Sequence, residues 1–273
     1  MEEKKQPRVK ILVACHKADP NIRQDDIYMP IQVGKALHPE LDLGFQCDNT
    51  GDNISEKNGS YCELTALYWA WKNLKDVDYI GLAHYRRYLD IKFDRIDHLK
   101  KNSIILAYPE YTSYSNFIHL TDGTTREDVY ILFKYLEKYY PQYCKYAIDY
   151  LFNYNGWIGC NLFLCERELF ENYCSWLFSV LRQLEKYLKP SGYARLKRIY
   201  GYLGEVMLPI YCRANGISIN FAPISDTRKN PLRYYLKKFY YKLAFKFSNP
   251  KSIKELKVPQ STAVSMINDG IVI

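Results

Sequence analysis

Apolar residues in this chain gather into short runs that alternate with longer amphipathic segments. The run at 9–14 is rich in β-branched residues and leads into the polar sequence His16-Lys17, which predicts a buried strand followed by a loop. Similar runs predict strands at 79–83, 103–107, 157–165 and 217–222, with a shorter candidate at 43–47.

Helical periodicity marks several segments between these strands. In 61–75 an apolar stripe runs from Leu64 to Leu74, and Ser60 with Glu63 predicts a capping box at the start of that helix. The same periodicity predicts helices at 126–139, 142–152, 167–187 and 200–214, and Gly216 suits the end of the last one.

Strands and helices therefore mix along the chain, with polar loops after several strands. This order predicts an α/β fold, in which ligands bind at the C-terminal ends of the strands. The length of 273 residues allows one large domain with a small appendage. We expect that domain over 1–225 and a distinct tail over 226–273.

The tail differs from the rest of the chain in composition. Between Arg228 and Lys251 it carries eight Lys or Arg, seven aromatic residues and no acidic residue. This pattern predicts a basic amphipathic helix that lies on an anionic membrane surface. The alternative is a packed C-terminal helix with a solvated basic face.

Composition adds an expectation about partners and location. The net charge of +8 favours an acidic partner, such as nucleotide phosphates, nucleic acid or an anionic membrane. The eight cysteines contain no C-x-x-C pair, which favours free thiols in a reducing cytosol over a zinc site. The start MEEKKQPR lacks a signal-peptide core, and no apolar run of about 18 residues occurs. We expect a cytoplasmic protein, peripheral on the inner face of the plasma membrane.

Two adjoining motifs carry a resemblance to a known family. ELTALYWAWKN (63–73) leads into GLAHYRRY (81–88), and ILVACHK (11–17), YMPIQVGKAL (28–37) and NYCSWLF (172–178) fit the same pattern. Over about residues 9–220 the chain resembles a bacterial family of capsular and exopolysaccharide biosynthesis proteins. Members are regarded as glycosyltransferases, some as galactofuranosyltransferases. The resemblance implies a GT-A-like domain with a mixed central sheet flanked by helices, and a UDP-sugar donor.

The resemblance also suggests where a donor would bind. Asp76-Val77-Asp78, the D-x-D sequence nearest the motif, precedes the expected strand at 79–83, whereas His84, Arg86 and Arg87 follow it. Arginine suits the charge that develops on a departing diphosphate. We therefore expect these cations to take over some or all of a metal's role, one arginine facing the site and the other forming a structural ion pair. We commit to no metal, although Mn²⁺ or Mg²⁺ would suit such chemistry.

Other polar residues are candidates for contacts with the donor. His16 and Lys17 follow the first strand, where such enzymes hold the base and ribose. Hydrogen bonds to the nucleotide or sugar are also expected from a loop and from the helix after it, at Asp48, Asn53, Asn58 and Glu63. For each of these the alternative is a local structural role: a surface loop, a turn or a helix cap.

The acceptor side needs a general base if the transfer inverts the sugar carbon. Glu205, early in the last long helix, is the candidate, with His84 as a second catalytic residue. A glutamate favoured by the helix dipole is the structural alternative. The family pattern reads E-R-L there, whereas this chain has Glu205-Val206-Met207. Trp157 and Asn161 are candidates for binding the acceptor.

Together these features favour a hexosyltransferase acting on a lipid-linked saccharide in capsule, exopolysaccharide or O-antigen synthesis. Two other classes stay open. One is a non-catalytic, membrane-associated scaffold of the same pathway. The other is a nucleic-acid-binding protein that uses the basic aromatic tail, which the pocket-like motifs of the main domain disfavour.

Overall fold

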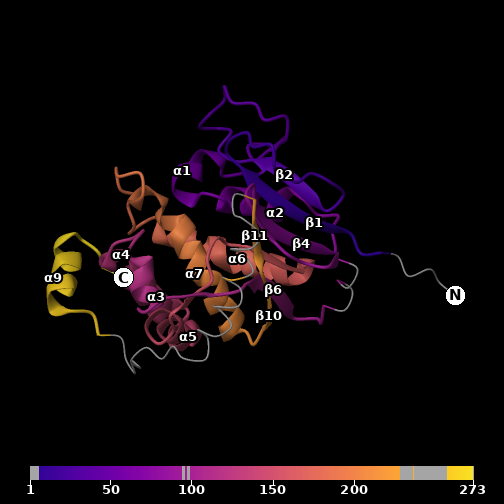
Figure 1. The fold of residues 1–273 in the computed structure, drawn as a ribbon. Coiled ribbons are helices and arrows are strands. Elements are labelled where there is room, and N and C mark those ends of the chain that lie inside the picture. Colours follow the sequence, from indigo (N-terminus) through magenta and orange to yellow (C-terminus); the bar gives the residue numbers. More distant parts are fainter. Residues whose placement is uncertain (1–5, 94–95, 97–98, 228–235, 237–256, 273) are drawn as a thin grey trace.

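A mixed nine-stranded sheet forms the centre of the molecule (Figure 1). This computed structural model describes residues 6–93, 96, 99–227, 236 and 257–272. The strands of the central sheet are β1 (Val9–Cys15), β2 (Tyr28–Gln32), β3 (Gln46–Cys47), β4 (Tyr79–His84), β5 (Arg87–Leu89), β6 (Ser103–Ala107), β9 (Phe163–Glu166), β10 (Ser218–Ala222) and β11 (Ile224–Asp226).

The strand order along the sheet is β10-β6-β9-β4-β1-β2-β3. Strand β1 pairs in parallel with both β2 and β4, whereas β9 runs antiparallel between β4 and β6. Strand β5 turns back from β4 and pairs with β11. A separate small sheet joins β7 (Glu110–Tyr111) to β8 (Gly156–Trp157).

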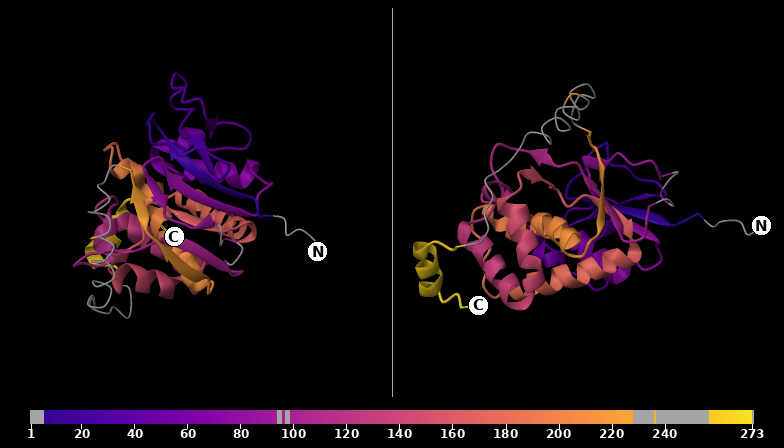
Figure 2. Two further views of the ribbon diagram at one scale, coloured as in Figure 1. Left: turned by 45° about the vertical axis from the view of Figure 1, so that its right-hand side comes forward. Right: turned by 90° about the horizontal axis from the view of Figure 1, so that it is seen from below.

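Most helices cover one face of this sheet (Figure 2). They are α1 (Asn58–Tyr61), α2 (Leu64–Asn73), α3 (Asn116–Leu120), α4 (Arg126–Tyr139), α5 (Pro141–Phe152), α6 (Arg167–Leu184), α7 (Ile199–Ala214) and α9 (Gln260–Asn268), with 3-10 turns η1 (Ser55–Lys57) and η3 (Leu196–Arg198). Strand alternation explains the two cores: Leu12 and Ala14 of β1 face the helices, and Ile11 and Val13 face the opposite core.

The structure confirms the predicted α/β fold with a mixed central sheet. The predicted helices at 126–139 and 142–152 match α4 and α5 within one residue. Two predicted elements are split in the structure: 61–75 breaks at Cys62 into α1 and α2, and 157–165 becomes β8, a turn and β9. Strands β2, β5 and β11 and helix α3 were not predicted.

The capping box predicted for Ser60 and Glu63 is wrong. Ser60 lies inside α1, and its hydroxyl donates to the Lys57 carbonyl. Glu63 is the N-cap residue of α2, but its side chain makes no cap hydrogen bond. The carboxylate points instead towards β4 and the turn before β9, as described below.

The predicted basic helix between Arg228 and Lys251 lies outside the described residues, apart from Leu236. The expected boundary between residues 225 and 226 falls inside β11, which pairs with β5 as far as Asp226. Helix α9, beyond this stretch, packs Met266 into the helix-side core. Within the described part of the chain, no helix is both long and apolar enough to cross a membrane.

The contact between β4 and β9 leaves no room for a side chain at Gly81. A Cβ there would lie 2.4 Å from the main-chain oxygen of Phe163, which cannot move without shifting β9. We expect Gly81→Ala to lower the free energy of unfolding by about 1–3 kcal/mol, measured by urea denaturation. Gly192→Ala, where no atom lies within 4 Å, is the control. Equal stability of the two variants would contradict this packing.

Candidate active site

Several predicted site residues meet at the C-terminal end of β4. The register of the parallel pair places His84 opposite Ala14, so that the ends of β1 and β4 lie at the same edge of the sheet. Helix α2 starts beside this edge, and α7 approaches it closely. A Cβ at Gly201 would lie 3.0 Å from the Cys62 Sγ, and one at Gly204 would lie 2.8 Å from Leu64. Glycine at these two positions therefore lets α7 pack against α1 and α2.

Glu63 and His84 form the centre of the site. Glu63 is only 5% exposed, and its Oε1 accepts a hydrogen bond of 2.7 Å from the Asn161 amide. The same oxygen lies 3.7 Å from the His84 Nε2. That nitrogen donates to the Cys160 carbonyl at 2.9 Å, and because a carbonyl can only accept, Nε2 carries a proton.

The two ionisable groups stabilise each other's charged form. Burial alone would raise the pKa of Glu63, but His84 and Asn161 outweigh it, and the pKa is lowered. Burial alone would lower the pKa of His84, but Glu63 and the Cys160 carbonyl outweigh it, and the pKa is raised. Each group therefore favours the charged form of the other across the contact between the start of α2 and the end of β4.

The side chain of Glu205 on α7 reaches the same cluster, but its pKa is raised, whereas that of Glu63 is lowered. The Glu205 Oε2 accepts a hydrogen bond of 3.1 Å from the Trp157 indole, and the Cys160 main chain donates a second one. Burial, followed by the charge of Glu63, raises the pKa of Glu205 from 4.5 to about 7. Two neighbouring carboxylates thus have separate roles: Glu63 stays ionised, whereas Glu205 exchanges a proton near neutral pH.

Unusual backbone conformations flank this cluster. Among the described residues, four non-glycine residues have positive φ, and three of them are Cys62, Cys160 and Asn161, with φ of 54°, 68° and 49°. Asparagine tolerates this region, but cysteine does so rarely, and such conformations typically cost about 1–3 kcal/mol each. Cys62 immediately precedes Glu63, and Cys160 supplies the carbonyl that His84 binds. The strain is thus concentrated where the site is built.

The two arginines of the HYRRY motif both face carboxylates. Arg86 lies in the turn between β4 and β5, and its Nε donates to Asp19 at 2.8 Å, which lowers the pKa of Asp19. Arg87 lies 3.9 Å from Asp226 and donates to the Cys160 Sγ at 3.1 Å. Each arginine therefore has an acidic neighbour, whereas we expected only one of them to form an ion pair. The tighter contact makes Arg86 the structural one, and Arg87 stands beside the cluster.

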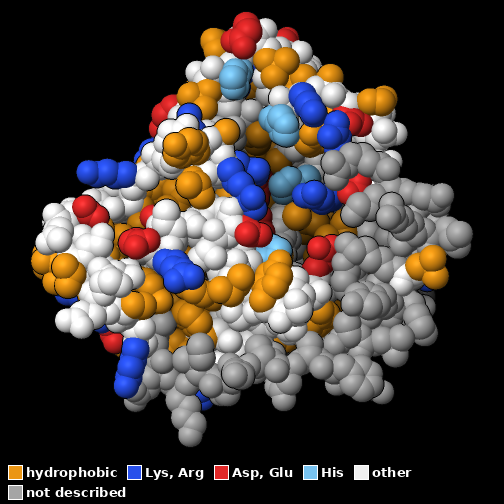
Figure 3. Space-filling view, turned by 60° about the vertical axis from the view of Figure 1, so that its left-hand side comes forward, with side chains coloured by type: hydrophobic (Ala, Val, Ile, Leu, Met, Phe, Trp, Pro, Cys, Tyr) orange, Lys and Arg blue, Asp and Glu red, His pale blue; other side chains and the backbone are white. Residues whose placement is uncertain are grey.

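Two further basic residues, His16 and Lys17, lie beside the cluster. His16 is exposed, and its ring meets the Tyr85 ring edge-on at a centroid distance of 5.1 Å. Partial desolvation of this exposed ring lowers the pKa of His16, and the charges of Lys17, His84 and Arg198 lower it further. Lys17 is exposed as well. On the face seen in Figure 3, Lys, Arg and His side chains gather around a hollow, with acidic side chains beside them.

Sequence reasoning missed Arg198, the residue before α7. Its guanidinium donates to the Cys62 Sγ at 3.1 Å and lies 5.5 Å from the centre of the Tyr202 ring. It stands two helical turns before Glu205 and therefore lies on the same side of α7. No motif includes it, and the basic run RLKR (195–198) is the only signal in the sequence.

Three residues predicted to contact the donor make local structural hydrogen bonds. Asp48 is fully buried, and its carboxylate accepts four hydrogen bonds, two from main-chain amides and two from the Ser55 and Thr65 hydroxyls. Asn53 closes a local turn with Gly51 and Ser55. Asn58 donates to the Cys62 carbonyl and to Thr65. The structure thus uses them to shape the loop before α2.

The predicted acceptor ligands lie at the cluster. Asn161 is 4% exposed and holds Glu63, and Trp157 is 7% exposed and donates to Glu205. The Trp157 ring also stacks on His119 of α3, with centroids 4.4 Å apart. Both residues therefore orient the two carboxylates, and contact with an acceptor would involve only a small part of each side chain.

The residues at this site do not suit a divalent metal. Glu63 is held by Asn161 and His84, and within the described residues no group of three or more His, Cys, Asp or Glu side chains could hold an ion. The D-x-D sequence lies at the other end of β4, where Asp76 and Asp78 both pair with Arg8. The expectation that this sequence lies away from the site is confirmed.

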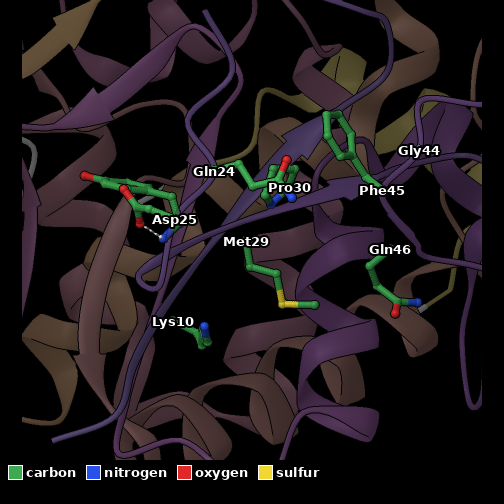
Figure 4. A pocket seen from close by; sticks show the side chains of 9 residues that line it. Lys10, Gln24, Asp25, Met29, Pro30, Gly44, Phe45 and Gln46 are labelled. Carbon is green, nitrogen blue, oxygen red and sulfur yellow. Dashed lines mark hydrogen bonds between the residues drawn. The ribbon is translucent and has the colours of Figure 1, made fainter.

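A small cavity of about 250 Å³ lies elsewhere, towards the edge of the sheet formed by β2 and β3 (Figure 4). Its lining includes Lys10, Asp25, Met29 and Gln46. No described residue of the cluster lines it, and Lys10 already donates to the Asp26 carbonyl at 2.6 Å. We therefore base the site on the cluster, where titratable groups converge.

The raised pKa of Glu205 has a consequence for stability. Between pH 4.5 and 7 the folded chain keeps a proton that the unfolded chain has released, so the free energy of unfolding falls as pH rises. Glutamine at this position has no proton to exchange. We therefore expect the free energy of unfolding of Glu205→Gln, taken relative to that of the wild type, to be about 3 kcal/mol higher at pH 8 than at pH 4. Denaturant unfolding from pH 4 to 8 measures it, with Glu168→Gln on the exposed side of α6 as control. A difference that does not change with pH would contradict the burial of Glu205.

The fold is similar to that of a known protein. The solved apo structure of the WbbM bifunctional glycosyltransferase is similar to it, with a TM-score of 0.72 and 28% identity. The match covers 81% of this chain and 45% of that one, so this chain spans less than half of that protein. The predicted likeness to a glycosyltransferase fold is confirmed. A comparison with curated proteins gave no match.

A family model described as a domain of unknown function, DUF4422, matches residues 10–216. That span contains β1 to α7, and with them Glu63, His84, Arg198 and Glu205. The chain belongs to the DUF4422 family.

Proposed function

We propose that this protein is a glycosyltransferase that uses a nucleotide-activated donor sugar and Glu205 as general base. The observation that carries the proposal is the meeting of a carboxylate of raised pKa, Glu205, with the basic residues Lys17 and Arg87 near the C-terminal ends of β1 and β4. This edge is where α/β sheets bind ligands. The similarity of the fold to a bifunctional glycosyltransferase supports the same reaction class.

The geometry suggests how the reaction would proceed. Glu205, ionised, would accept the proton of an acceptor hydroxyl as that oxygen bonds to the anomeric carbon of the donor. The bond from that carbon to the phosphate oxygen would break on the opposite side, with inversion, and the nucleoside diphosphate would leave with its electron pair. A base with a pKa near 7 suits this step at neutral pH. Glu63 and His84 would keep Glu205 and the Cys160 turn in place.

The departing diphosphate needs compensation of its negative charge. Lys17 and Arg87 supply positive charges around the cluster, and Glu63 favours the protonated form of the His84 imidazole. Because the described residues do not suit a divalent metal, we propose that these cations take over its role. Trp157 and Asn161 would border the acceptor.

Finer features of the function rest on the sequence motifs. We propose UDP as the nucleotide, galactofuranose or another hexose as the sugar, and a lipid-linked saccharide of a surface polysaccharide as the acceptor. The basic aromatic segment between Arg228 and Lys251 supports contact with an anionic membrane on the cytoplasmic side. The same segment is the feature that would favour a scaffold or a nucleic-acid-binding protein if no donor binds.

A ligand screen tests the proposal directly. We expect UDP and one UDP-sugar, but not GDP or CMP, to raise the melting temperature by several degrees at about 100 times the dissociation constant. The shift should be the same with manganese and with a chelator. No shift with any nucleotide, together with a shift from a single-stranded oligonucleotide, would contradict the proposal and favour the nucleic-acid alternative.

A further inference from the structure

Arg198 differs from the other arginines around the cluster. Arg86 and Arg87 each face a carboxylate, at 2.8 Å and 3.9 Å. Arg198 is exposed, and in the part of the chain that the structure describes it has no carboxylate partner within ion-pair distance. Among the described residues, its guanidinium donates a hydrogen bond to the Cys62 thiol, which is a weak acceptor. Its positive charge is therefore available to a ligand.

A chain of contacts places Arg198 across the site from His16. Cys62, which Arg198 contacts, directly precedes Glu63, and Glu63 lies 3.7 Å from His84. On the other side of His84, the ring of Tyr85 packs against His16. Arg198 and His16 thus flank the same edge of the sheet, one from α7 and the other from the end of β1. The charge of Arg198 contributes to the lowered pKa of His16, after burial and Lys17, which agrees with this placement.

Other features make this position attractive to an anion. No side chain caps the start of α7, a helix of 16 residues whose dipole adds positive potential at that end. Lys17 follows His16 and is exposed. Arg198 and Lys17 thus bring two positive charges to this edge of the sheet from two separate segments, and the imidazole of His16, whose pKa is lowered, adds a hydrogen-bond donor.

We propose that Arg198, together with His16 and Lys17, binds the diphosphate of the donor. This inference rests on the proposed function and assigns its phosphate site. The guanidinium presents a planar fork that matches phosphate oxygens, and Arg86 holds the loop after β1 through Asp19. Helix α7 carries the base Glu205, and Arg198, the N-cap residue of this helix, lies seven residues or about 10 Å before it along the axis. A single rigid helix sets the spacing between the leaving group and the acceptor.

Titration calorimetry with UDP and with inorganic pyrophosphate tests the assignment. We expect Arg198→Ala to weaken the binding of both ligands by about 10-fold or more, as loss of a charged hydrogen bond does. Arg198→Lys should recover part of the loss, because it keeps the charge but not the fork. Arg195→Ala is the matched control: that arginine is also exposed, lies three residues away and faces Asp122 at 3.7 Å. It should bind both ligands like the wild type.

The outcomes separate this inference from the proposed function. If the wild type binds UDP and Arg198→Ala binds UDP and pyrophosphate equally well, the assignment of Arg198 is wrong and the transferase proposal stands. If pyrophosphate binding depends on Arg198 but UDP does not bind, the anion site is right and the nucleotide donor is wrong. If the wild type binds neither ligand, both are overturned. An unchanged melting temperature of the free Arg198→Ala variant confirms that the variant is folded.

Discussion

The buried contact between Glu63 and His84 is the constraint on which the site depends. A carboxylate that is 5% exposed is strongly unfavourable unless a positive charge and hydrogen bonds compensate it. His84 supplies the charge from the end of β4, and Asn161 supplies a hydrogen bond from the turn before β9. These groups come from three segments that are distant in sequence. The start of α2, the end of β4 and that turn must therefore converge in the folded chain.

The position of Glu205 follows from the same contact. The main chain of Cys160 accepts from His84 and donates to Glu205, so the turn that serves the ion pair also orients the second carboxylate. The negative charge of Glu63 adds to burial in raising the pKa of Glu205. Backbone strain at Cys62 and Cys160 fits this reading, because residues in rare conformations persist only where surrounding contacts hold them. The strained backbone at these residues thus lowers stability locally, while it holds the charged side chains in their positions.

Periodicity in the sequence was sufficient for the α/β class and for the long helices, because burial of one face leaves a regular pattern. It missed β2, whose five residues include Pro30, a residue that usually argues against a strand. It also joined α1 to α2, because nothing local indicates a positive φ at Cys62. Among the site candidates, Glu63, His84, Asn161 and Glu205 do meet, whereas Asp48 and Asn58 support a loop. Arg198 could not be found from the sequence, since only the packing of α7 on α1 brings it to the site.

The proposed mechanism depends most on Glu205 acting as a base whose pKa its surroundings raise. The most direct measurement is the pH dependence of kcat/KM for sugar transfer in the wild type and in Glu205→Gln. If Glu205 is the base, the wild-type rate rises with pH through a midpoint near 7, and the variant is slower by about 10²-fold or more and lacks that rise. A wild-type midpoint near 4.5, or a variant that keeps both the rate and the rise, would contradict it.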